Sequence, residues 1–253
     1  MEWMGWLIFL SSVFVGAYVQ SVTGFAMGMI VIAVVGASGV ISLPILTAVA
    51  SLITMVNVAM ALKGHTRSLH RPMFVWMAVG LLPAIWIGVW ILTVMNENAQ
   101  ATLQLLLGTF ITLGCLSMMI RPRPLARVSP RWACLSAGLA AGVVGGMFSA
   151  SGPITGWFSY RQPLELAAIR ATLLGFFALS TTSRTVIVGF SGGLTNEVLV
   201  LSATALPLVV LGTWMGREMP PALTDLKLKQ MAFGLLLLMG VLILAGGLHR
   251  IFF

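Results

Sequence analysis

Residues 230–248 read QMAFGLLLLMGVLILAGGL, and no charged side chain interrupts them. A helix that crosses the hydrocarbon core of a membrane needs about 20 predominantly apolar residues. Backbone polar groups find no water at that depth, so only helices and closed barrels cross it. Barrel strands alternate apolar and polar residues over about 10 positions, whereas the run Leu235–Leu238 shows no alternation. This stretch therefore predicts a transmembrane helix.

The rest of the chain has the same character. Of its 253 residues, 59% are hydrophobic and 8% are charged, and the mean hydropathy is +1.04. A soluble domain carries about 25% charged residues, and disorder requires low hydrophobicity, so the composition excludes both. The predicted fold class is all-α, a polytopic transmembrane helical bundle that lies in the lipid bilayer.

Further apolar segments repeat along the chain on both sides of a basic stretch at its middle. They are expected at residues 5–19, 24–36, 43–62, 73–95, 101–120, 132–148, 152–160, 165–190, 197–217 and 227–248. The first two segments are short for a crossing, and so are the sixth and seventh. Small polar residues join each short pair, Gln20–Gly24 in one case and Ser149–Pro153 in the other. Glycine and proline weaken a helix at these points, so the sequence predicts two broken or re-entrant helix pairs.

The two halves of the chain resemble each other. Three motifs recur in the same order: Gly24 with Gly28 and Gly152 with Gly156; Leu82-Pro83 with Gly88 and Leu206-Pro207 with Gly212; Gly108 with Gly114 and Gly234 with Gly240. Each half holds an odd number of segments, so the second half should lie inverted in the membrane, as in many secondary transporters. We predict a first repeat at 1–120, a cytoplasmic basic connector at 121–131 and a second, inverted repeat at 132–253.

The positive charge of the chain predicts its orientation. The formal net charge is +8, and the basic residues lie in short loops between apolar runs. The tendency of cytoplasmic loops to carry lysine and arginine explains this pattern, so nucleic acid is not an expected partner. Placing loops 63–72 and 121–131 in the cytoplasm puts most basic residues at the inner face. Both termini are then predicted on the outer side.

The sequence shows no constellation for catalysis. His65, His70 and His249 have no cysteine or carboxylate at metal-ligand spacing, and no phosphate-binding glycine-rich loop is present. No carboxylate lies well inside an apolar segment. An enzyme is therefore not predicted, and neither a metal site nor a cofactor is expected.

The junctions of the two short pairs are the first candidate site. Helix N-termini at such breaks present N–H groups and a positive dipole end, which suit an anion. Hydroxyl, amide and backbone groups that could bind an oxyanion are those of Gln20, Ser21, Thr23 and Gly24 in the first junction, and of Ser149, Ser151, Gly152 and Thr155 in the second. The alternative is that these small residues only allow close helix packing.

Arg184, which follows Thr181 in the eighth segment, is the second candidate. A charge within a membrane span is costly and indicates function by default, although a side chain so near Phe190 could snorkel to the outer interface. Arg170, at the inner end of the same segment, is interpreted as a residue where anions enter or as a topology anchor. Asn57 in the third segment is either a substrate ligand or a polar contact between helices.

Taken together, these features resemble the sulfite exporter TauE/SafE family, also called the toluene-sulfonate uptake permease family. The resemblance covers nearly the whole chain, and the stretches that carry it are Gly16–Gly28 with Thr23-Gly24-Phe25, Gly142–Gly146 followed by Ser151-Gly152-Pro153, and Leu206-Pro207 with Gly212. It implies a secondary transporter of the bacterial inner membrane, an exporter of sulfite, organosulfonates or related small organic anions. In that membrane, the termini that the charge pattern places outside are periplasmic. An anion channel and a membrane scaffold without transport are the alternatives, and a homodimer is one assembly that the chain could form.

Overall fold

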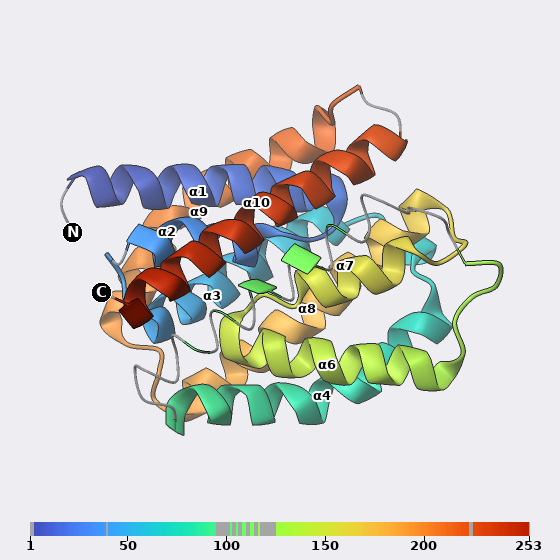
Figure 1. The fold of residues 1–253 in the computed structure, drawn as a ribbon. Coiled ribbons are helices and arrows are strands. Elements are labelled where there is room, and N and C mark those ends of the chain that lie inside the picture. The colour runs from blue at the N-terminus through green and yellow to red at the C-terminus, as the bar shows by residue number, and fades with distance from the viewer. Residues whose placement is uncertain are drawn as a thin grey trace.

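The computed structural model describes residues 3–38, 40–94, 125–222 and 225–252, with separate positions at 102, 105, 108, 109, 112, 113 and 116. Every regular element in these residues is helical, which confirms the predicted all-α class. The elements are α1 (Trp3–Thr23), α2 (Met27–Ser38), α3 (Leu43–Leu62), η1 (Thr66–Ser68), α4 (Arg71–Val94), α6 (Arg131–Phe148), α7 (Gly152–Tyr160), α8 (Leu166–Phe190), α9 (Asn196–Glu218) and α10 (Asp225–Phe252) (Figure 1). The predicted segment 101–120 lies almost wholly outside the described residues.

Within the described residues, 6 helices are long and apolar enough to cross a membrane, namely α1, α3, α4, α6, α8 and α9. By contrast, α2 has 12 residues and α7 has 9. Because a crossing needs about 20 residues, α2 and α7 are too short to span alone. The chain is a multi-pass membrane protein.

The expectation that both helices of each pair are short is wrong, because α1 has 21 residues and α6 has 18. Helix α1 continues through its polar end because two hydroxyl groups donate to carbonyls one turn back. Ser21 Oγ donates to Ala17 O at 2.8 Å, and Thr23 Oγ1 donates to Val19 O at 2.8 Å. Each hydroxyl is thus paired within its own helix, so the polar end of α1 needs no water there. Each pair therefore consists of one long and one short helix.

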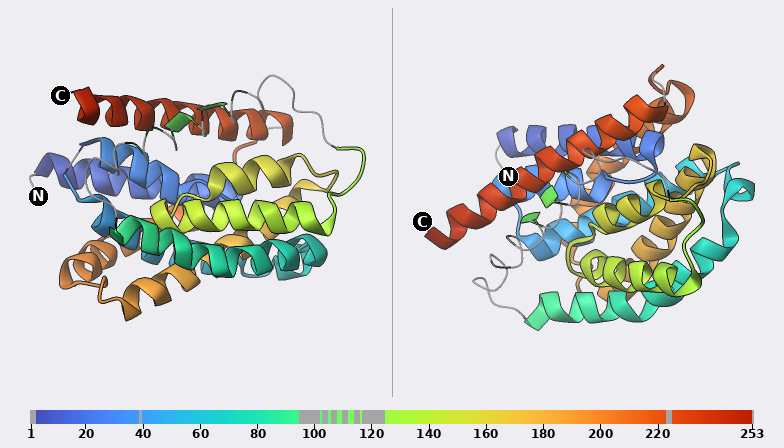
Figure 2. Two further views of the ribbon diagram at one scale, coloured as in Figure 1. Left: turned by 60° about the horizontal axis from the view of Figure 1, so that its bottom comes forward. Right: turned by 45° about the vertical axis from the view of Figure 1, so that its right-hand side comes forward.

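The start of α1 and the end of α10 lie at the same end of the bundle (Figures 1 and 2). The connections that follow α3 and α9, and those that precede α6 and α8, lie at the opposite end. These connections carry basic residues, among them Lys63, Arg67, Arg127 and Arg161. The fold therefore gathers the basic loops at one end of the bundle.

Helices α4 and α6 pack backbone against backbone. A Cβ atom at Gly138 would overlap the carbonyl oxygen of Met77, and a Cβ atom at Gly146 would overlap that of Ile85. The two contacts advance in the same direction along both chains, so α4 and α6 run parallel. Small residues at a membrane helix interface permit this close approach.

Helices α1 and α9 form a second pair of this kind. The Cβ position of Gly212 lies 2.7 Å from Phe14 O, and that of Gly216 lies 2.8 Å from Tyr18 O. These contacts also advance in the same direction, so α1 and α9 are parallel as well.

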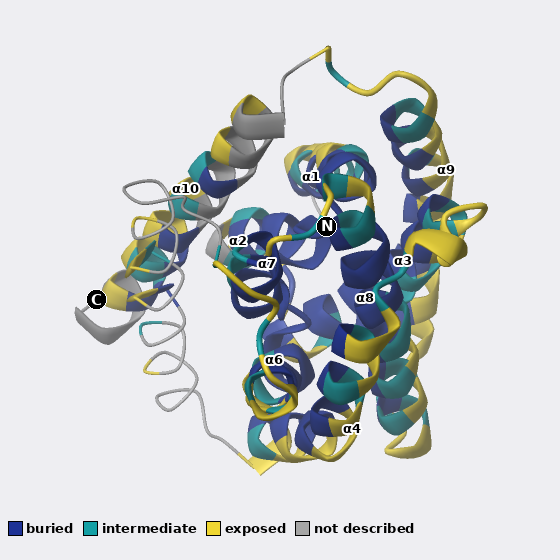
Figure 3. Cartoon of the chain, turned by 90° about the vertical axis from the view of Figure 1, so that its right-hand side faces the viewer, coloured by how far each residue is buried: buried dark blue, intermediate teal, exposed yellow. Residues whose placement is uncertain are grey.

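Burial is greatest in the middle of the bundle, around α2, α3, α7 and α8 (Figure 3). The outer helices α4 and α9 instead present large apolar side chains on their exposed faces. Trp86 is 62% exposed, Trp90 is 56% exposed and Val200 is 58% exposed. Apolar surface of this extent suits contact with lipid.

Candidate functional site

The first helix break lies between α1 and α2. Gly24 and Ala26 have φ angles of +89° and +103°, a backbone region that glycine adopts at little cost. Gln20 Oε1 accepts a hydrogen bond from the N–H of Met27 at 2.8 Å, so the Gln20 side chain caps the start of α2. The expectation that Gly24 begins the second helix is wrong, because this cap sets the start at Met27.

The second helix break lies between α6 and α7. Ser149 adopts a left-handed φ of +52° and donates its N–H to Gly145 O at 2.8 Å, which ends α6. Helix α7 begins at Gly152, as predicted. Ser151 is 1% exposed, and Thr155 is fully buried with its hydroxyl donated to Ser151 O at 3.0 Å. The polar groups of this break therefore face the protein interior and not lipid.

The structure brings the two breaks into contact. A Cβ atom at Gly28, in the first turn of α2, would overlap the carbonyl oxygen of Ser149. The Cβ position of Gly152 lies 3.3 Å from the ring of Phe25. Tyr160, at the end of α7, donates its hydroxyl to the carbonyl oxygen of Thr23 at 2.6 Å. The two breaks therefore form one buried polar region.

Arg184 is enclosed by helices α3 and α6, and it is only 2% exposed. Its Nη1 donates to Thr47 O at 2.8 Å and to Ser51 Oγ at 2.9 Å. Its Nη2 donates to Thr47 Oγ1 at 2.8 Å, and its Nε donates to Gly146 O at 2.9 Å. The interpretation that Arg184 snorkels to the outer interface is wrong, because these acceptors hold the guanidinium inside the bundle. None of the four acceptors is a carboxylate.

A short chain of hydrogen bonds connects Arg184 to the second break. Ser51 Oγ accepts from Arg184 and lies 3.1 Å from Ser149 Oγ. Gly146 belongs to the last turn of α6, where carbonyl groups lack partners within the helix and carry partial negative charge. Arg184 therefore satisfies the end of the long helix of the broken pair.

Asn57 occupies a comparable position beside the first break. Its Nδ2 lies 3.0 Å from Ala17 O, 3.2 Å from Ser21 Oγ and 2.7 Å from Thr213 Oγ1. These hydrogen bonds join α3 to α1 and α9. Asn57 is thus a polar contact between helices, one of the two alternatives, while its role as a ligand stays a prediction.

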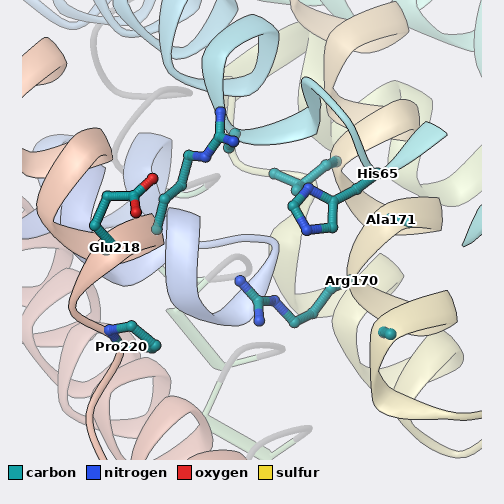
Figure 4. A pocket seen from close by; sticks show the side chains of 10 residues that line it. His65, Arg170, Ala171, Glu218 and Pro220 are labelled. Carbon is teal, nitrogen blue, oxygen red and sulfur yellow. The ribbon is translucent and has the colours of Figure 1, made fainter.

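A cavity of about 280 Å³ lies beside the first break (Figure 4), and it is called the inner cavity because it lies at the end of the bundle that carries the basic loops. His65, Arg170, Arg217 and Glu218 are among its lining residues and come from α8, α9 and the loop after α3. Arg170 Nη2 donates to Ser21 O, so the wall of the cavity touches the end of α1. Two guanidinium groups against one carboxylate give the inner cavity an excess of positive charge.

The buried region also holds three polar residues that are not among the candidates from the sequence. Thr47, Ser51 and Thr54 repeat at positions i, i+4 and i+7 of the third apolar segment, so they share one face of α3. This spacing could have predicted a polar face. Thr181, which was predicted, donates to Phe177 O within its own helix at 2.7 Å.

A bundle of apolar helices with two contacting helix breaks and an enclosed arginine is the architecture of a membrane transporter. The family described as sulfite exporter TauE/SafE matches residues 8–243. The chain belongs to this family, which is a family of transporters and not of enzymes, and the resemblance noted in the sequence is confirmed.

A relative with a curated description supports the same assignment. The chain is 37% identical over 225 residues to the probable sulfite/organosulfonate exporter TauE of Cupriavidus necator. The matched region covers 89% of this chain and 88% of that protein. No solved structure matches the chain.

Proposed function

We propose that the protein is a secondary carrier that exports sulfite, organosulfonates or related small organic anions across the bacterial inner membrane. The observation that carries this proposal is Arg184, a guanidinium 2% exposed whose hydrogen bonds go to hydroxyl and carbonyl oxygens. A buried cation without a carboxylate among its acceptors attracts an anion strongly, because little solvent screens its charge. The description of the relative from Cupriavidus necator supports the choice of cargo.

The proposed substrate site comprises both helix breaks and the polar residues beside them. Its members are Gln20, Ser21, Thr23, Gly24, Asn57, Ser149, Ser151, Gly152, Thr155, Thr181 and Arg184. The inner cavity is the proposed place where anions enter, with Arg170 as its cation nearest the first break. The contact between the breaks supports this assignment, since carriers of this type bind their cargo where broken helices meet.

We further propose that residues 1–120 and 132–253 form two inverted repeats. Such an inversion exchanges α1 with α6, α3 with α8 and α4 with α9. The parallel pair of α4 and α6 then corresponds to the parallel pair of α1 and α9. Asn57 on α3 and Arg184 on α8 also correspond, because each binds the long helix of a broken pair. These two correspondences support the repeat.

Electrogenic efflux is the expected mode of transport. A membrane potential negative inside expels one negative charge with about 2.3 kcal/mol per 100 mV, which sustains a gradient of about 50-fold. In proteoliposomes clamped with potassium and valinomycin at equal pH, efflux of sulfite and sulfonates should saturate and should follow the imposed potential. Flux that follows a pH gradient but ignores the potential would contradict this mode. Flux without saturation would favour a channel, and no flux of any of these anions would favour a scaffold.

Both termini are expected in the periplasm, because the basic loops share the opposite end of the bundle. Alkaline phosphatase fused after Phe253 should be active, and green fluorescent protein at the same point should not fluoresce. Insertion of either reporter after Arg127, in the basic connector, should reverse the two results. A fluorescent fusion after Phe253 would refute this orientation.

A further inference from the structure

Three polar side-chain atoms near the first break are buried and have no hydrogen-bond partner within the described part of the chain. They are Gln20 Nε2, Thr54 Oγ1 and Asn57 Oδ1. Gln20 and Asn57 are 0% exposed, and Thr54 is 2% exposed. Most buried polar groups are paired, and an unpaired one costs about 1–3 kcal/mol. Unpaired donors and acceptors gathered at a helix break are groups that a polar ligand would satisfy.

Gln20 lies on the face of α1 that Asn57 contacts. Asn57 contacts Ala17 and Ser21, and Gln20 lies three residues after Ala17 and one before Ser21, so all three share that face. The other amide atom of Gln20, Oε1, already accepts from Met27 N. Gln20 Nε2 therefore lies at the N-terminus of α2, where the helix dipole favours negative charge.

The hydrogen bonds determine which amide atom of each side chain is free. The Asn57 nitrogen faces Ala17 O, which can only accept, so the oxygen Oδ1 cannot take its place. The Gln20 oxygen faces the N–H of Met27, which can only donate, so the nitrogen Nε2 is the free atom. Gln20 thus offers a donor, and Asn57 offers an acceptor.

Ser21 connects Asn57 to the wall of the inner cavity. Arg170 and Gly216 both line the inner cavity. Arg170 donates to Ser21 O, and the Cβ position of Gly216 lies 2.8 Å from Ser21 Cβ. Ser21 Oγ in turn lies 3.2 Å from Asn57 Nδ2. Ser21 therefore contacts both the wall of the inner cavity and Asn57.

We propose that Gln20 Nε2 and Asn57 Oδ1 form a two-point recognition site for anions that carry a hydrogen-bond donor besides their oxyanion group. Hydroxyalkanesulfonates belong to this class. Gln20 Nε2 and the N-terminus of α2 bind the oxyanion, and Asn57 Oδ1 accepts from the hydroxyl group. An anion without a donor leaves Asn57 Oδ1 unpaired and is therefore disfavoured. This inference rests on the proposed function.

The test compares 2-hydroxyethanesulfonate with 1-propanesulfonate, which have equal charge and nearly equal size, in proteoliposome counterflow. The wild-type protein should prefer the hydroxylated anion in kcat/KM by about tenfold or more. Asn57→Leu should bring this ratio close to one. Thr213→Val removes an acceptor of the same Asn57 amide but leaves Oδ1 unchanged, so this matched control should keep the wild-type ratio.

Gln20→Glu tests the donor. The carboxylate retains an oxygen for the N–H of Met27, so the cap of α2 is kept, while the donor becomes an acceptor. Transport of both sulfonates should fall by about tenfold or more. The unfolding temperature in detergent should also fall, because a carboxylate is costly at a position as buried as that of Gln20. Gln20→Met, which removes the donor without adding charge, should lower transport as well.

The outcomes separate this inference from the function on which it rests. Equal transport of the two sulfonates by the wild-type protein would overturn the recognition site and leave an anion exporter. Unchanged transport by folded Gln20→Met would overturn it too, because methionine has no donor, and this result holds even where Asn57→Leu fails to fold. Absence of flux for every sulfonate and for sulfite would instead overturn the proposed function.

Discussion

Transport by the Arg184→Gln variant is expected to fall by about 10- to 100-fold. Hydrogen bonds to a charged group contribute about 1.5–3 kcal/mol, which corresponds to roughly this range in rate or affinity. The neutral glutamine removes the cation that attracts the anion, and it cannot serve both Thr47 and Gly146, which the guanidinium joins. The measurement is the initial rate of sulfite and sulfonate counterflow in proteoliposomes.

Two further variants separate charge from geometry at this position. Arg184→Lys keeps the charge but lacks the planar fork of donors, so transport should lie between those of the wild type and Arg184→Gln. Arg127→Gln removes a charge from the exposed connector and should leave transport unchanged. If folded Arg184→Gln transports as well as Arg127→Gln does, Arg184 only joins helices. Its proposed role in transport would then be wrong.

Gly138→Leu is expected to lower the free energy of unfolding by about 3 kcal/mol or more. Overpacking a filled core costs typically about 1–3 kcal/mol, and more where the neighbours cannot move. The neighbour here is backbone, since a Cβ atom at Gly138 would overlap the carbonyl oxygen of Met77. The added side chain would force α4 and α6 apart. Thermal unfolding of the purified protein in detergent measures the change.

Gly234→Leu is the matched control for this variant. It makes the same substitution within a helix, but no atom lies within 4 Å of the Cβ position of Gly234 in the described part of the chain. Its unfolding temperature should stay close to that of the wild type. Equal unfolding temperatures for Gly138→Leu and the wild type would show that the contact between α4 and α6 is not tight.

The amino-acid sequence by itself determined the class of fold and the places of the two breaks. Apolar runs such as 230–248 must be helical in a bilayer, because no solvent there can satisfy the backbone. Gln20–Gly24 and Ser149–Pro153 interrupt such runs with small polar residues, glycine and proline. These signals are local, so they could be read without knowing how the helices pack.

Only the tertiary structure decided which partners the polar groups have. Arg184 and Thr47 are 137 positions apart in the chain, and the nearness of Arg184 to Phe190 equally permitted a side chain that reaches the outer interface. The end of α1 and the start of α2 likewise depend on the hydrogen bond from Met27 to Gln20 across the break. Local pattern shows which side chains are polar. The acceptor that each donor meets depends on the packing of helices that lie far apart in the sequence, because a membrane interior leaves every polar group to find its partner within the protein.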